Sequence, residues 1–323
     1  MIATRLTYEH LKSNFLGIVY KATPSRGASI IDQLRQELER TRSQCAPSTN
    51  KNKLTAINAF EKFLNECLPG KIVTTRTLSE HHIKSFEQWA LDNGNLPGYV
   101  ALHMRCLRAL IKGFNKNGYK LFGDVNTSCC QTKKRAVNEE TLKRIMTMKL
   151  PKGPFIALAR DYFLLCFFGM GIPLIDAVYI KRKNYKGGIL TYYRHKTHRM
   201  VTINVEKELK ELLDRLATDD SPYLLPVLTS KDPEECRRQY RRFYQRYSRA
   251  LAKISKMLGL DIRLTSYVPR HSWASIAYKN GVDVNTIASA LGHANTNVTY
   301  TYLKEICNDQ LGRANQVVIK SIK

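Results

Sequence analysis

The sequence predicts a mostly α-helical protein with a small β-sheet, in which an all-helical domain precedes an α+β domain. Three observations indicate this fold class. Apolar residues recur at helical spacing through much of residues 30–115. The basic segment 127–137 lacks helical periodicity, which indicates a linker and divides the chain into residues 1–131 and 132–323. In the second domain, two short runs of β-formers within residues 189–205 lie among helical stretches.

The charge balance indicates a nucleic-acid partner. Lys and Arg number 52 against 27 Asp and Glu, a formal net charge of +25 over 323 residues. This excess favours a polyanion, and double-stranded DNA is favoured over a membrane surface because the charge is spread along the whole chain. No apolar run approaches the length of a membrane span, and the first residues lack a signal-peptide core. A cytoplasmic, nucleoid-associated protein is therefore expected.

The eight cysteines do not form a recognisable metal or disulfide framework. No C-x-x-C pair occurs, and Cys129 and Cys130 are adjacent, which suits neither a disulfide between them nor a zinc site. Reduced, mostly structural thiols are expected, with no metal and no cofactor.

The amino-terminal domain is predicted to contain four helices, over about residues 30–42, 53–67, 79–92 and 99–115. Pro and Gly separate these segments, and Ser79 is a candidate N-cap of the third helix. Basic side chains on the fourth helix would reach DNA phosphates or form an ordinary solvated face, and the solvated face is the simpler interpretation of each residue alone. These residues are Arg105, Arg108 and Lys112.

The linker is basic at three consecutive positions, Lys133, Lys134 and Arg135. A segment of this kind would cross DNA between two lobes, where each phosphate neutralised adds salt-sensitive affinity. Asn138 follows as a candidate N-cap, and carboxylates at the next two positions suit the dipole of a helix that starts there.

The second domain is predicted to contain a buried helix followed by a β-hairpin. Residues 155–168 are almost wholly apolar and form the helix. The strands 189–194 and 200–205 enclose the residues between them, so Lys196 lies in the connection of the hairpin.

A long helix is predicted from Pro233 to about Leu258. Aromatic and aliphatic residues form one stripe, and Arg and Lys cover the rest, with no acidic residue from Cys236 onward. A solvated helix face normally mixes both signs of charge, so a face of one sign is better explained by DNA. The candidate contacts are Arg237, Arg238, Arg241 and Arg242.

Residues 263–302 contain a set of polar residues at defined spacing. Arg270 precedes two helical segments, His293 closes the sequence Leu-Gly-His, and Tyr302 follows nine residues later. This ordered set resembles the tyrosine recombinases, or phage-type integrases, and the resemblance extends back to about Asn138. That family carries H-x-x-R, then L-G-H, then a nucleophilic tyrosine about nine residues further on. Tyr267 stands where the family usually has its first histidine.

The resemblance implies a helical, SAM-like core-type DNA-binding domain over residues 1–131 and a tyrosine-recombinase catalytic domain over residues 132–323. It implies a site-specific recombinase or integrase that cleaves and rejoins DNA through a 3′-phosphotyrosyl link at Tyr302. Neither ATP nor metal is needed, because the protein–DNA ester keeps the bond energy. A homotetramer on two duplexes is expected, and mobile-element integrase and DNA invertase are equally open roles.

The local chemistry agrees with these roles. Cleaving a phosphodiester without a metal needs a nucleophile, cations on the non-bridging oxygens and a proton for the leaving 5′ oxygen. By the resemblance, Tyr302 is the nucleophile and Lys196, in a Lys-Thr pair, is the general acid. Arg270 supplies a guanidinium fork that fits a phosphate, and His293 donates a hydrogen bond to the same phosphate. Tyr300 is expected to be a packing residue.

One expected cation is absent from its usual position. The family has its first catalytic arginine in the turn after the buried helix, a few residues before an acidic position that Asp176 fits. Here that turn holds Met170 and Gly171 and contains no arginine. Arg194 is the replacement that we favour, because it lies two residues before Lys196 and a continuing strand would project both side chains to one face.

Other interpretations of these arginines are open. Arg182 lies in a Lys-Arg-Lys cluster at the end of an apolar run, which indicates a phosphate-facing helix end, and Arg199 follows the turn. Arg194 would alternatively bind the DNA backbone away from the scissile phosphate.

Two alternative functions are also open. The missing arginine is compatible with a catalytically impaired DNA-binding relative, and a type IB topoisomerase would relax DNA by the same chemistry. Retention of Tyr302, Lys196, Arg270 and His293 favours the recombinase.

Overall fold

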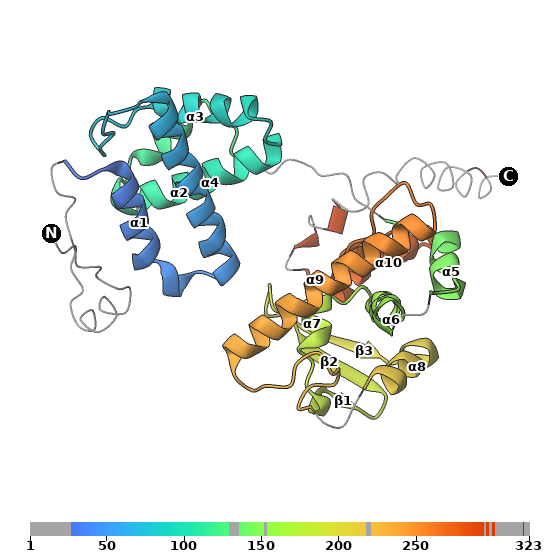
Figure 1. The fold of residues 1–323 in the computed structure, drawn as a ribbon. Coiled ribbons are helices and arrows are strands. Elements are labelled where there is room, and N and C mark those ends of the chain that lie inside the picture. Colours follow the sequence, from blue (N-terminus) through green and yellow to red (C-terminus); the bar gives the residue numbers. More distant parts are fainter. Residues whose placement is uncertain are drawn as a thin grey trace. The chain divides into compact units, whose positions relative to one another are not determined.

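The computed structural model divides the chain into two compact units, Met1–Thr132 and Lys133–Lys323. Within the described residues both units are mostly helical and the second also holds a three-stranded sheet, which confirms the predicted fold class (Figure 1). No helix in this part of the chain is long and apolar enough to cross a membrane. The structure describes residues 27–128, 136–151, 154–217, 221–293, 295–296, 299–300 and 319.

Four α-helices form the described part of the first unit, and α1, α2 and α4 contact one another. Their core includes Phe60, Phe86 and Met104, each 0% exposed. The helices are α1 (Ile30–Arg40), α2 (Pro47–Cys67), α3 (Glu80–Asp92) and α4 (Pro97–Phe114), with 3-10 turns at Arg42–Gln44 and Gly118–Phe122.

Capping residues explain where these helices begin. The Ser29 hydroxyl accepts a hydrogen bond from the main-chain N–H of Ile31 (3.2 Å) at the start of α1. At the start of α3, the main-chain N–H of Ser79 donates to Nδ1 of His82 (3.2 Å), so an imidazole takes the place of the usual Glu in a capping box. Helices α2 and α4 each begin at a proline, which has no N–H to leave unpaired, and so start earlier than predicted.

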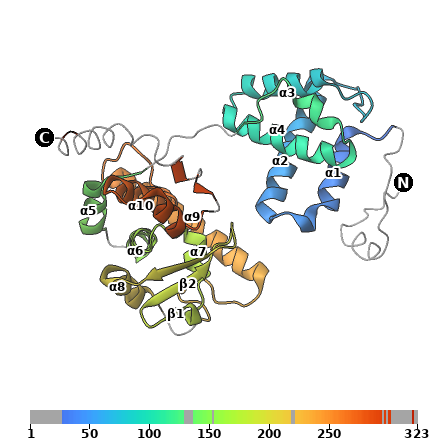
Figure 2. The same ribbon diagram turned by 180° about the vertical axis from the view of Figure 1, so that it is seen from behind.

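The second unit combines helices with an antiparallel sheet of order β1-β2-β3 (Figure 2). The strands are β1 (Tyr185–Lys186), β2 (Ile189–Tyr193) and β3 (Met200–Asn204). The helices are α5 (Glu139–Thr147), α6 (Pro154–Phe168), α7 (Leu174–Val178), α8 (Lys207–Leu216), α9 (Pro233–Met257), α10 (Val268–Lys279) and α11 (Val284–Ala290), with a 3-10 turn at Arg182–Asn184.

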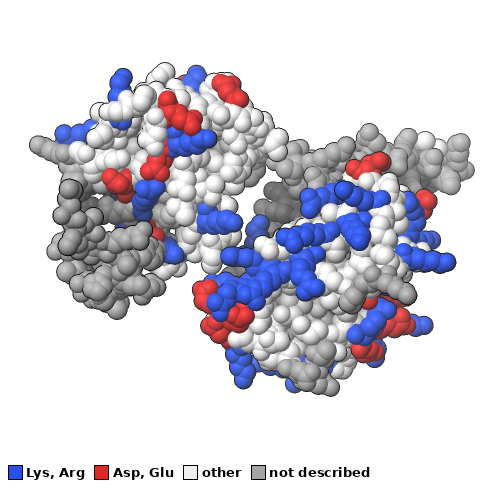
Figure 3. Space-filling view, viewed as in Figure 1, with Lys and Arg blue, Asp and Glu red and all other residues white. Residues whose placement is uncertain are grey.

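Helix α6 is the buried centre of this unit, as its apolar sequence predicts. It contacts α8, α9 and α10, and Tyr162, Phe163 and Cys166 are 0% exposed. On α9, Tyr247 and Leu251 are also 0% exposed and belong to the same core. The opposite side of α9 carries a band of Lys and Arg side chains (Figure 3). One helix therefore links the core to a strongly basic surface.

Candidate active site

Arg270 lies near the start of α10 and is almost completely buried (1% exposed). Its Nη1 donates to the carbonyl oxygen of Gly171 (3.0 Å), and its Nη2 donates to that of Leu291 (2.5 Å). The guanidinium therefore fixes α10 to the turn after α6 and to the end of α11. A positive charge is held where these three distant parts of the sequence meet.

The turn after α6 has no room for a side chain at Gly171, one of the two positions at which the resemblance places an arginine. Met170 and Gly171 have positive φ angles of 53° and 71°. A Cβ atom at Gly171 would lie 3.0 Å from Cα of Arg270, closer than ordinary van der Waals contact. Gly171 therefore allows the turn to pack directly on α10. A side chain at this position would displace Arg270.

Arg194 follows β2 and is also buried (5% exposed). Its Nη1 lies 3.3 Å from Oδ2 of Asp176, a residue of α7 that is 3% exposed. A Cβ atom at Gly292 would lie 2.9 Å from Cγ of Arg194, so the Leu-Gly-His segment packs on the arginine stem. Nη1 therefore faces the carboxylate of Asp176, whereas Nε is a buried donor that makes no hydrogen bond within the described part of the chain. Buried donors normally have a partner, so a donor of this kind is suited to bind a ligand.

His293 lies within electrostatic reach of both arginines and is 7% exposed. Burial, followed by the positive charges of the two arginines and Lys196, lowers the pKa of the His293 imidazole to about 3. The ring is therefore neutral near pH 7. Its Nδ1 lies 2.8 Å from Oγ1 of Thr299, and when the threonine hydroxyl donates, the ring hydrogen resides on Nε2.

The loop between β2 and β3 docks on the Leu-Gly-His segment. Oγ1 of Thr197 donates to the carbonyl oxygen of Gly292 (3.1 Å), and Nη1 of Arg199 donates to that of His293 (2.7 Å). Lys196 lies between these two anchors with an exposed side chain, and its charge contributes to the lowered pKa of His293. The positive charges of Arg270, Arg194 and Lys196 thus all act on the imidazole of His293.

The expectation that Arg194 and Lys196 share one face of a continuing strand is wrong. Strand β2 ends at Tyr193, and Lys196 lies in a turn. Arg194 is directed inward to Asp176, whereas Lys196 remains at the surface. The two cations approach the same site from different depths because the backbone turns between them.

The other arginines considered for the missing charge have different partners. Nε of Arg160 lies 3.2 Å from Oδ1 of the adjacent Asp161. Nε of Arg182 donates to the carbonyl oxygen of Ser221 (2.8 Å). Arg199 donates to the main chain of the Leu-Gly-His segment. Among these candidates, Arg194 is the one that packs against Gly292 and acts on the pKa of His293.

Two of the three tyrosines near the candidate site, Tyr267 and Tyr300, belong to the described residues. Tyr302 lies outside the described residues. Tyr300, expected to be a packing residue, is 49% exposed, and the preceding Thr299 is 0% exposed. Tyr267 caps the start of α10, is 47% exposed, and has its ring 6.1 Å from that of His271. Tyr267 is therefore accessible at the N-terminus of the helix that carries Arg270.

The predicted DNA contacts of the first unit already have some protein partners. Nη1 of Arg105 donates to the carbonyl oxygens of Thr127 (3.1 Å) and Ser128 (2.8 Å), and Nη1 of Arg108 donates to Oγ1 of Thr127 (3.0 Å). Lys112 is exposed. The three linker residues, Lys133, Lys134 and Arg135, lie outside the described residues.

On α9 the basic residues differ in their partners. Arg237 and Arg238, in the first turns, form ion pairs with Glu234 and Glu235. Further along the helix, Arg241, Arg242 and Arg249 are exposed, and the guanidinium of Arg246 lies over the ring of Phe155, 4.0 Å from its centroid. The positive band in Figure 3 therefore extends from the middle of α9 onward.

Sequence patterns did not reveal the contacts that assemble this site. The sequence analysis gave no role to His195, whose ring lies 3.0 Å from Asp176, or to Gly292, which supports Arg194. The signals in the sequence were slight. His195 stands between two cationic residues, and Gly292 is the small residue of a Leu-Gly-His sequence.

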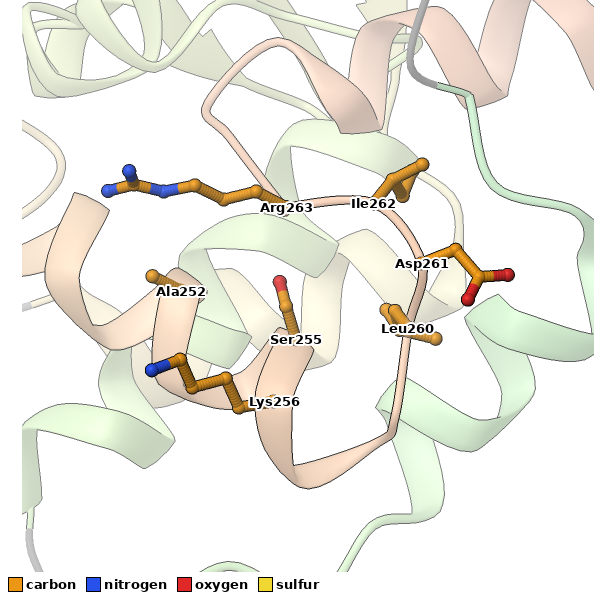
Figure 4. Close-up of a pocket in the computed structure, with 7 residues that line it drawn as sticks. All are labelled: Ala252, Ser255, Lys256, Leu260, Asp261, Ile262 and Arg263. Atoms are coloured by element: carbon orange, nitrogen blue, oxygen red, sulfur yellow. The ribbon is translucent and has the colours of Figure 1, made fainter.

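A cavity of about 360 Å³ lies between the end of α9 and the loop that leads to α10 (Figure 4). The side chains of Lys256 and Arg263 extend to the same side of it, and Asp261 points away from them. None of the candidate catalytic residues lines this cavity, so it is separate from the site described above.

Gly292→Ala is expected to destabilise the protein by more than about 1 kcal/mol, because alanine is strained at φ +61° and its Cβ would collide with Arg194 and Val201. Gly281→Ala is the matched control, since Gly281 has φ +85° but nothing within 4 Å of the added Cβ. Thermal unfolding should show the larger loss for Gly292→Ala. Equal losses of thermal stability in the two variants would show that backbone strain alone, without the contact to Arg194, causes the effect of Gly292→Ala.

Comparison with known proteins agrees with this fold. Residues 172–307 match the model of the phage integrase family. Tyrosine recombinase XerA of Pyrococcus furiosus is 27% identical over 216 residues, which cover 64% of this chain and 69% of that protein. Tyrosine recombinase XerC of Rickettsia bellii is 36% identical over 58 residues, which cover 18% of this chain and 19% of that protein.

Solved structures with low sequence identity share the fold. The XerH site-specific recombinase on palindromic difH DNA has a TM-score of 0.62 at 16% identity, covering 89% of this chain and 84% of that chain. The Tn1549 transposon integrase with transposon right-end DNA has a TM-score of 0.60 at 12% identity, with 85% and 94% covered. A lambda integrase dimer on a COC′ core site has a TM-score of 0.59 at 16% identity, with 85% and 95% covered.

In its fold, in its clustered cations and in these matches, the chain is similar to the tyrosine recombinases, enzymes that break and rejoin DNA strands. Residues 172–307 are the part that matches the phage integrase family. This range contains all of the residues that the sequence analysis proposed for catalysis.

Proposed function

We propose that this chain is a site-specific DNA recombinase, acting as the integrase of a mobile element, that works through a 3′-phosphotyrosyl intermediate at Tyr302. The observation that carries the proposal is the cluster of Arg270, Arg194 and His293 with Lys196 at its edge. Two buried guanidiniums and a lysine around a neutral imidazole carry more positive charge than the one carboxylate of Asp176 offsets, which suits the binding of a phosphate.

In the cleavage step, the phenolic oxygen of Tyr302 attacks the scissile phosphorus. The new oxygen–phosphorus bond forms as the bond from phosphorus to the 5′ oxygen breaks. The phenolic proton of Tyr302 is lost to solvent, and Lys196 gives a proton to the leaving 5′ oxygen. Rejoining reverses these steps when a 5′ hydroxyl of the partner strand attacks the phosphotyrosine. The number of ester bonds is conserved, so ATP is not required, and in this proposal Arg and Lys side chains supply the positive charge that a metal ion would otherwise provide.

The arginines and the histidine bind the non-bridging oxygens of the same phosphate. Arg270 and Arg194 provide two guanidiniums for the charge that develops in the transition state. Arg194 thereby replaces the arginine absent from the turn at Met170 and Gly171. His293 donates from Nε2 while Thr299 satisfies Nδ1. Rigid, buried donors of this kind lower the barrier because they do not reorganise during the reaction.

Both units contribute to DNA binding in this proposal. The first unit, with Arg105, Arg108 and Lys112, acts as the core-type DNA-binding domain, and the linker crosses the duplex. The basic side of α9 contacts phosphates beside the site, and a homotetramer assembles on two duplexes in the nucleoid. The contact of α9 with phosphates is supported by the sequence from Cys236 to the end of the helix, which contains Arg and Lys and no acidic residue.

The proposed function is tested with nicked duplexes that trap the covalent intermediate. A library with random sequence around the nick is incubated with the chain in EDTA, and DNA that stays attached to protein in SDS is recovered and sequenced. A selected duplex that gives an SDS-resistant complex in EDTA would support the proposal. Complete dependence of the cleavage step on magnesium would contradict it.

Arg241→Ala is expected to weaken DNA binding by a similar factor for all sequences and to reduce the slope of log affinity against log salt by about 1, since one phosphate contact is lost. Lys210→Ala is the matched control, because Lys210 lies on α8 and pairs with Asp214 (2.5 Å). Binding measured over a salt series checks both variants. An unchanged slope for Arg241→Ala would show that α9 does not contact a DNA phosphate at this position.

Tyr267→Phe is expected to slow cleavage modestly, by about twofold to tenfold, because a single phenolic hydrogen bond to phosphate is lost. Tyr267→His should retain activity, since the side chain is 47% exposed and an imidazole also donates to a phosphate. Rates of covalent-complex formation on the selected duplex check both variants. A Tyr267→His protein that failed to fold would show instead that Tyr267 is needed for packing.

A further inference from the structure

His195 and Asp176 form a hydrogen-bonded pair that the roles above leave unused. Oδ1 of Asp176 accepts from the main-chain N–H of His195 (2.9 Å) and lies 3.0 Å from its ring Nδ1. The other carboxylate oxygen faces the guanidinium of Arg194 (3.3 Å). Because an ionised carboxylate can only accept, Nδ1 carries the hydrogen of the ring bond.

This pairing leaves Nε2 of His195 directed away from the carboxylate. The side chain is 41% exposed, and Nε2 makes no hydrogen bond with any residue that the structure describes. The ring of Tyr179 packs edge-on against the imidazole, with centroids 4.6 Å apart. The ring is thus held at Nδ1 and on one side, while the second nitrogen is open to a ligand.

Anchoring the hairpin loop does not require the imidazole. The main-chain N–H of His195 already donates to Oδ1 of Asp176, and Thr197 and Arg199 bind the Leu-Gly-His segment. The ring bond adds little to this attachment. Its distinct effect is to fix the direction of Nε2, at a residue that lies between Arg194 and Lys196 in the chain.

We propose that His195 is a phosphate-contacting residue of the active site, in which Asp176 holds Nδ1 and Nε2 donates to the DNA phosphate beside Arg194 and Lys196. This inference rests on the proposed function. A phosphate at Nε2 and the carboxylate at Nδ1 place an acceptor at each end of the ring, so both nitrogens act as donors. Asp176 then orients two phosphate ligands at once, one guanidinium and one imidazole.

Two substitutions separate phosphate contact from anchoring. His195→Asn places an amide nitrogen near the position of Nδ1, so it keeps the bond to Asp176 and removes the Nε2 donor. His195→Gln carries its amide nitrogen to about the position of Nε2 and gives up the bond at Nδ1. The rate of covalent-complex formation on the selected nicked duplex is measured at saturating protein for both variants, together with duplex affinity and thermal unfolding.

His195→Asn is expected to show the same thermal unfolding as the wild type. It should form the covalent complex at least about tenfold more slowly, because one charge-assisted hydrogen bond to the phosphate is lost. His195→Gln is expected to retain more of the rate than His195→Asn. Wild-type rates for His195→Asn would show that the ring only anchors the loop, and equal slowing of both variants would also overturn the contact. If His195→Gln does not fold, the rate of His195→Asn decides alone. A wild-type chain that forms no covalent complex would instead refute the proposed function, and this contact with it.

Discussion

Replacing Tyr302 with Phe is expected to abolish the covalent protein–DNA complex and to leave DNA affinity unchanged. The substitution removes only the phenolic oxygen, which the proposed mechanism uses as the nucleophile. Loss of a nucleophile costs about 10⁴-fold or more in rate, because the remaining binding groups cannot form the intermediate. The SDS-resistant complex and the mobility of the native complex, measured on the same nicked duplex, separate the two effects.

Tyr300→Phe is the matched control for this prediction. Tyr300 lies two residues earlier, is 49% exposed, and carries the same phenolic group. The variant should keep most of the cleavage activity. Loss of the covalent complex in Tyr300→Phe, together with its retention in Tyr302→Phe, would show that the nucleophile has been assigned to the wrong tyrosine.

Arg194→Lys is expected to lower the cleavage rate by about 10²- to 10³-fold with little change in DNA affinity. Lysine keeps a positive charge beside Asp176 but lacks the planar fork that grips a phosphate through two donors. Losing one preorganised donor to the transition state costs about 3–4 kcal/mol, whereas many other cations hold the duplex. Single-turnover cleavage rates and binding isotherms check these two quantities.

The choice of lysine avoids a second effect of the substitution. Arg194→Ala would leave the buried carboxylate of Asp176 without its guanidinium, which costs about 3–5 kcal/mol of stability for a buried pair. Arg182→Ala is the control, because Arg182 donates to Ser221 and is expected to affect affinity more than cleavage. If Arg194→Lys cleaves at the wild-type rate and Arg199→Ala does not cleave, the role of the missing arginine belongs to Arg199.

Periodicity in the sequence was sufficient to predict most of the helices, because each buries one apolar stripe. Tyr247, Leu251 and Ile254 of the apolar stripe on α9 are 0% exposed, and most of the middle of α6 is buried, as its composition indicated. The errors fall at helix starts. Pro47 and Pro97 were interpreted as breaks between helices, although a proline fits the first turn of a helix as well as it ends one.

The candidate site was predictable as a set of residues but not as a geometry. The spacing of Arg270 and His293 gave the set through the resemblance, whereas the burial of Arg194 depends on α7, which contributes Asp176 from another part of the chain. No local pattern encodes such a contact. The pair formed by Asp176 and His195 was missed for the same reason, since its two members lie 19 positions apart.

Partners within the protein also changed the interpretation of single basic residues. Arg105 and Arg108 looked like free cations on a helix face, but each donates to oxygen atoms of residues 127–128. Charge alone does not distinguish a residue that binds DNA from one that orders the start of a linker. Their assignment as DNA contacts stays a prediction.

The bond between Thr299 and His293 has a consequence for which protomer supplies the nucleophile. Thr299 is 0% exposed, and its Oγ1 lies 2.8 Å from Nδ1 of His293. Tyr302 is three residues further along the chain, so a fully extended backbone could carry its Cα at most about 11 Å from that of Thr299. In the proposed mechanism, a tyrosine this close along the chain would attack the phosphate that is held by the cations of its own protomer.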